Sequence, residues 1–103
     1  MIHKIKTQQD ILPLNGKFPK EVIVEVKRVA DILDTHYNSQ GIDGGYILIA
    51  EDIADLDCVR NEYFDYVNMV YEFKDNVGDW ASILYLLGTE YSVTLITPKQ
   101  HIN

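Results

Sequence analysis

The clearest hydrophobic pattern lies between Pro19 and Tyr37, where apolar residues recur every three or four positions. The stripe consists of Val22, Ile23, Val26, Val29, Ala30, Leu33 and Tyr37. This spacing places the apolar side chains on one face of a helix and predicts an amphipathic helix that packs on a core. Pro19 suits a first helical turn, because the N–H that it lacks would have no intrahelical partner. The polar residues 38–41 predict the end of the helix.

The patterns after residue 44 are typical of β-strands. Residues 46–50 form a continuous apolar run that predicts a central strand, and residues 66–73 alternate well enough to predict a second strand. Residues 80–87 and 90–97 are rich in strand-forming residues and flank the pair Gly88-Thr89. Two such runs joined by a glycine-led pair predict a β-hairpin.

The remaining segments complete the predicted fold. We expect a helical turn near residues 53–59 and a reverse turn over residues 75–78. Pro13 interrupts residues 1–18, which predict a short strand or packed arm followed by a turn. Together the patterns predict an α+β fold in a single domain, residues 1–103, with one long N-terminal helix packed on an antiparallel sheet of about four strands that ends in a β-hairpin.

Acidic residues are concentrated in the second half of the chain. Residues 43–97 contain eleven carboxylates and two bases, whereas residues 1–42 contain six bases and five acids. The formal net charge of −7 argues against direct binding to nucleic acid or to an anionic membrane. The longest apolar runs have five residues, far below the roughly 20 of a membrane-spanning helix. The single cysteine fits a reducing compartment, so we expect a cytoplasmic protein.

Signatures of catalysis, metal binding and nucleotide binding are missing from the sequence. An EF-hand loop counted from Asp55 fails, because Arg60 and Tyr66 occupy the positions that need glycine and glutamate. The three histidines lack metal-ligand spacing, and the acidic neighbours of Cys58 disfavour a reactive thiolate. We therefore expect no catalytic residue, no metal and no cofactor. A small enzyme that uses a pair of carboxylates stays open as an alternative.

Aromatic residues are interleaved with carboxylates across residues 61–66. Tyrosine is enriched at protein interfaces because it combines a rigid apolar ring with a polar tip. A ring exposed in an acidic field can stack on arginine while charge attraction strengthens the contact. The alternative is that most of these rings belong to the core. The predicted partner-binding residues are Glu51, Asp52, Asp55, Asp57, Glu62, Tyr63, Asp65 and Tyr66.

These features predict an interaction protein that binds a basic surface of another protein and blocks it. The partner would be a nucleic-acid-binding enzyme, as for a phage or mobile-element inhibitor of a bacterial defence nuclease, or a cationic toxin, as for an immunity protein. An accessory binding domain whose acidic surface only confers solubility is a further alternative. A homodimer is also an option if residues 91–97 form an uncovered edge strand.

Overall fold

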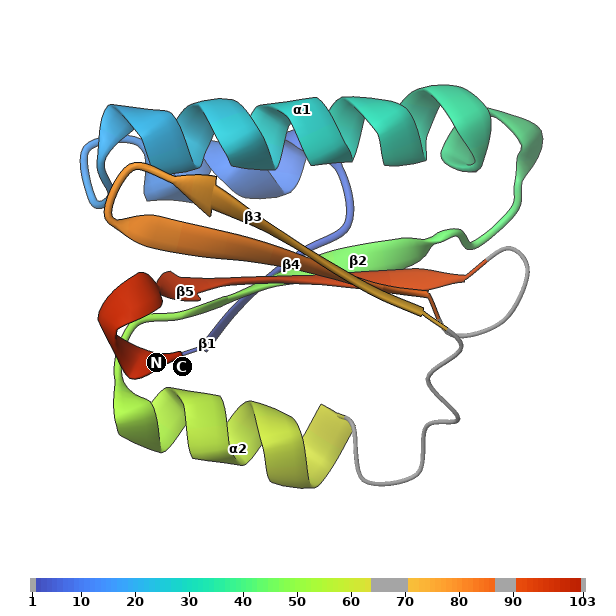
Figure 1. Cartoon of the computed structure of the whole chain (residues 1–103). Helices are drawn as coiled ribbons and strands as arrows, with labels where there is room; N and C mark the ends of the chain where they lie inside the picture. The colour runs from blue at the N-terminus through green and yellow to red at the C-terminus, as the bar shows by residue number, and fades with distance from the viewer. Residues whose placement is uncertain (1, 64–70, 87–90, 103) are drawn as a thin grey trace.

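A five-stranded sheet lies between two helices, one on each face (Figure 1). The computed structural model describes residues 2–63, 71–86 and 91–102, and for residues 60, 62, 63 and 71–73 it describes the backbone alone. The elements in chain order are β1 (Ile2–Ile5), the 3₁₀-helix η1 (Gln8–Leu14), α1 (Lys20–His36), η2 (Asn38–Gln40), β2 (Gly45–Ala50), α2 (Ile53–Tyr63), β3 (Tyr71–Val77), β4 (Trp80–Leu86), β5 (Ser92–Pro98) and η3 (Lys99–His101). None of the helices in these ranges is long and apolar enough to cross a membrane.

The strand order in the sheet is β1-β2-β5-β4-β3. β1 runs antiparallel to β2, β2 runs parallel to β5, and β4 runs antiparallel to both β5 and β3. The predicted α+β class is therefore confirmed, and so is the antiparallel pairing of β4 with β5. The sheet differs in detail, because it is mixed and has five strands. The segment before the long helix contains β1 and η1, so the strand expected among residues 1–18 belongs to the sheet.

β2 is apolar along its whole length, and β5 is apolar at Val93, Leu95 and Ile96, because both faces of the two strands are covered. Ile47 and Ile49 belong to the core under α1, whereas Leu48 and Leu95 belong to the core under α2. A strand buried on both faces needs apolar residues at successive positions, which is typical of parallel pairs. β5 lies between β2 and β4, so the condition for the homodimer alternative, an uncovered edge strand at residues 91–97, is not met.

The apolar stripe of α1 packs as the sequence predicts. Val22, Val26 and Ala30 are fully buried against the sheet, together with side chains from η1. α2 contains the expected helical turn and extends beyond it to residue 63. The reverse turn predicted over residues 75–78 lies later, because β3 continues to Val77 in register with β4. Residues 71–73 of the predicted strand belong to β3, and residues 66–70 lie outside the described ranges.

A glycine pair fixes the start of β2 next to β5. Gly45 has a φ of +123°, and a Cβ at this position would overlap the backbone carbonyl of Ser92. The Ser92 N–H donates a hydrogen bond of 3.0 Å to the carbonyl of Gly44, whose Cα lies against the ring of Tyr37. Only glycine allows this close approach of two backbones and a helix end.

Candidate functional site

Four of the predicted partner-binding carboxylates gather at the start of α2. Glu51 and Asp52 precede the helix, and Asp55 and Asp57 lie in its first two turns. Glu51, Asp52 and Asp57 are exposed, and Asp55 is partly buried. We refer to Glu51, Asp52, Asp55 and Asp57 as the α2 acidic surface. It lies on the sheet face opposite α1 (Figure 1).

Two members of the α2 acidic surface also hold the helix start together. Asp52 Oδ1 accepts a hydrogen bond of 2.8 Å from the Asp55 N–H, and Asp55 Oδ2 accepts one of 3.3 Å from the Glu51 N–H. These bonds satisfy backbone donors that have no partner within the helix, and negative charge is favoured by the helix dipole at this end. Asp52 and Asp55 therefore have a structural role in addition to their charge.

An exposed apolar side chain adjoins these carboxylates. Ile53, the first residue of α2, is 57% exposed, whereas Leu56 and Val59 of the same helix are buried against the sheet. The other predicted binding residues are not placed by the structure. Glu62 and Tyr63 belong to the last turn of α2, described by its backbone, and Asp65 and Tyr66 lie outside the described ranges.

The ion pairs between described side chains lie away from α2. Lys6 Nζ is 3.2 Å from Asp43 Oδ2, and Asp43 Oδ1 accepts a hydrogen bond of 3.1 Å from the Gly45 N–H. The Gly45 hydrogen bond and then the Lys6 hydrogen bond lower the pKa of Asp43. This pair lies at the end of β2 farthest from α2.

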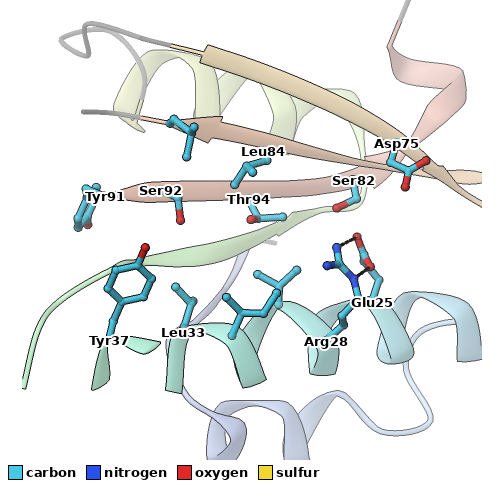
Figure 2. A pocket seen from close by; sticks show the side chains of 13 residues that line it. Glu25, Arg28, Leu33, Tyr37, Asp75, Ser82, Leu84, Tyr91, Ser92 and Thr94 are labelled. Atoms are coloured by element: carbon cyan, nitrogen blue, oxygen red, sulfur yellow. Dashed lines mark hydrogen bonds and ion pairs between the residues drawn. The ribbon is translucent and has the colours of Figure 1, made fainter. Parts of the chain in front are cut away.

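A cavity that sequence analysis missed lies between α1 and the sheet. Its volume is about 340 Å³, and its walls come from α1, from β3, β4 and β5, and from the residues next to α1 and β5 (Figure 2). Apolar side chains, among them Leu33 and Leu84, line much of it. Pockets of roughly 300–1,000 Å³ with an apolar lining and a few polar groups are the usual form of small-molecule sites.

An ion pair between a buried carboxylate and a partly exposed guanidinium occupies one end of this cavity. Arg28 Nε and Nη2 donate to the two carboxylate oxygens of Glu25 at 2.7 and 2.9 Å. Glu25 is 8% exposed although it is charged. The hydrogen bonds from Arg28 lower the pKa of Glu25 against the opposing effect of burial, and a hydrogen bond from the Ser82 hydroxyl lowers it further.

Hydroxyl groups mark the other end of the cavity. Figure 2 shows Tyr37, Tyr91 and Ser92 together at this end, with Thr94 between them and the ion pair. Burial raises the pKa of Tyr91, and the charge of Asp43 adds to this effect. Sequence reasoning missed the site because the pattern of α1 was used only to locate apolar residues. A sequence signal for the ion pair was present: Glu25 lies next to Val26 on the apolar side of the helix, and Arg28 follows three residues later.

Within the described ranges, no group of three or more His, Cys, Asp or Glu side chains is arranged to hold a metal ion.

Comparison with known proteins finds no relative. No family model matches the chain, and no curated protein or solved structure shows a significant match to it.

Proposed function

We propose that this chain is a protein-binding domain whose α2 acidic surface docks on a basic surface of another protein. The observation that supports this most is the gathering of four carboxylates within seven residues at one exposed helix start, in a chain of net charge −7. The exposed side chain of Ile53 lies among them. A charged rim beside an apolar anchor is the usual composition of a protein interface.

The two kinds of side chain have different effects on binding. Charge attraction acts over about 10 Å at 0.1 M salt and raises the rate at which a cationic partner is captured. The contact made by Ile53 acts only after docking, when its apolar surface is removed from water, and it slows dissociation. Binding of this kind weakens as salt is added, mainly through slower association.

The proposed outcome of docking is inhibition. A protein that binds nucleic acid exposes lysine and arginine side chains that neutralise phosphates. Carboxylates placed on such a surface compete with the phosphates for the same side chains. A nuclease blocked in this way would lose nucleic-acid binding and activity together.

The test replaces Asp57 by lysine, because Asp57 is an exposed member of the α2 acidic surface outside the capping bonds. Asp31→Lys is the matched control, since Asp31 is exposed on α1 and its replacement changes the net charge equally. The wild type and both variants serve as bait in a lysate of the source organism at low and at moderate salt. Quantitative mass spectrometry then identifies the captured proteins.

The proposal requires a basic protein that the wild type and Asp31→Lys capture at low salt and that Asp57→Lys loses. The same protein must lose activity or nucleic-acid binding when wild-type protein is added, and this loss tests inhibition separately. If all three baits capture the same proteins equally, or if capture does not change with salt, the α2 acidic surface does not bind a partner and only contributes to solubility.

A further inference from the structure

The cavity under α1 has different chemistry at its two ends. Ser82 lies at the end with the Glu25–Arg28 pair, and Ser92 lies at the hydroxyl end (Figure 2). In the sheet register Ser92 pairs with Leu86, four residues along β4 from Ser82. At about 3.3 Å per residue the two ends are about 13 Å apart. With a volume of about 340 Å³, the cavity fits an extended molecule of small cross-section.

The charges on the cavity wall favour a positive head group. Glu25 and Arg28 neutralise each other through their two hydrogen bonds, whereas Asp75 of β3 adds a further negative charge at the same end (Figure 2). Arg28 also interacts with the charge of Asp75, and two carboxylates with one guanidinium leave a net charge of −1 at this end, which attracts a cation and repels an anion. Asp75 is exposed, so an ammonium group beside it keeps part of its hydration and avoids most of the cost of burial.

We propose that this cavity binds a small extended aliphatic amine, with its ammonium group beside Asp75 and its chain against the apolar wall. A hydroxyl at the far end of the chain would reach the hydroxyl groups of Tyr37 and Ser92. The site lies on the face of the sheet opposite the α2 acidic surface, so it is independent of the proposed protein docking.

Three probes that differ only in the head group test this assignment. Each has an eight-carbon chain with a terminal hydroxyl, and the other terminus carries an amine, a second hydroxyl or a carboxylate. Titration of ¹⁵N-labelled protein follows the amide signals of Ser82 and Thr94, which line the cavity. We expect the amine to bind about fivefold more tightly than the diol, and the carboxylate to bind most weakly. In Asp75→Asn the amine should fall to the affinity of the diol.

A pair of tryptophan variants locates the binding. Ile32 lines the cavity and is 41% exposed, so Ile32→Trp fills the opening with little effect on the core. Val24 is exposed on the same helix outside this cavity, and Val24→Trp is the matched control. Loss of the amine with Ile32→Trp alone would support the site. Absence of shifts for every probe, tightest binding of the carboxylate, or equal binding to both tryptophan variants would overturn it.

Discussion

Replacement of Arg28 by methionine removes the charged partner of a buried carboxylate and keeps an unbranched apolar chain in place of the aliphatic part of arginine. Glu25 accepts hydrogen bonds of 2.7 and 2.9 Å from Arg28 and is almost fully removed from water. In Arg28→Met the hydroxyl of Ser82 remains as a donor to Glu25, but the positive charge is lost. A buried charge without its counter-charge destabilises the folded state, so we expect the variant to be less stable at neutral pH.

The size of this effect follows from the exposure of the two side chains. Breaking a buried ion pair costs about 3–5 kcal/mol, and an exposed pair contributes about 0–1 kcal/mol. The side chain of Arg28 is 59% exposed and that of Glu25 is 10% exposed, so solvent screens one partner and not the other. We expect a loss of about 2 kcal/mol. For a domain of this length, that corresponds to a melting temperature lower by roughly 8–12 °C.

Urea denaturation followed by circular dichroism measures this loss as a function of pH. Because the folded-state pKa of Glu25 is lowered, the pair contributes its stability above the ordinary pKa of 4.5 and loses it as the pH falls through the folded-state value. In Arg28→Met, burial without the arginine favours the neutral acid. The difference in unfolding free energy between wild type and variant should therefore be largest near neutral pH and shrink below pH 4.5.

Lys27→Met is the matched control, because Lys27 is exposed one residue earlier on α1 and carries the same charge. We expect it to change the free energy of unfolding by less than about 0.5 kcal/mol. In the double variant Glu25→Gln/Arg28→Met, the loss should be smaller than the sum of the two single losses. An Arg28→Met cost equal to that of Lys27→Met at every pH would refute the role given to this pair.

Three further predictions test the fold, and thermal unfolding checks each. Gly45→Ala should lower the free energy of unfolding by about 3 kcal/mol or more, because the new Cβ would overlap the Ser92 carbonyl at a positive φ. Gly41→Ala is the control: Gly41 also has a positive φ, +72°, but an added Cβ meets no described atom there, so the loss should be about 1 kcal/mol. Equal costs would contradict the close approach of β2 and β5. Thr97→Val should raise stability by about 1 kcal/mol, since the buried Thr97 hydroxyl has no hydrogen-bond partner among the residues that the structure describes, and a loss would reveal one. Asp52→Ala should lower the free energy of unfolding by about 1 kcal/mol, because it removes the acceptor for the Asp55 N–H at the start of α2. Asp52→Asn should lower it much less, since asparagine also accepts this hydrogen bond. Equal losses would contradict the capping role of Asp52.

Much of the fold was predictable because its signals are local. The stripe of α1 repeats within a few residues, and the apolar run of β2 marks a buried strand whatever its neighbours are. Pairing between distant strands has no such local signal. The parallel pairing of β2 with β5, and the addition of β1 at the edge, depend on segments more than forty residues apart. The turn-forming residues Asp75 and Asn76 lie in a strand because pairing with β4 overrides their local preference.

The candidate sites divide in the same way. The carboxylates of the α2 acidic surface lie within seven residues of one another, so their proximity could be predicted from the sequence alone. The cavity under α1 could not be predicted in this way, because Glu25 and Ser82 meet only when α1 packs on β4. Sequence also could not show that Asp52 and Asp55 bind backbone N–H groups, and this finding moves the decisive substitution to Asp57.

The association rate of the captured partner tests the docking model most directly. Stopped-flow measurements at ionic strengths from about 0.05 to 0.5 M compare the wild type with Asp57→Lys and Asp31→Lys. We expect the rate constant of the wild type and of Asp31→Lys to fall steeply with salt, and that of Asp57→Lys to be lower at low salt and nearly flat. Identical rates and identical salt slopes for the two lysine variants would contradict the claim that the α2 acidic surface captures a cationic protein.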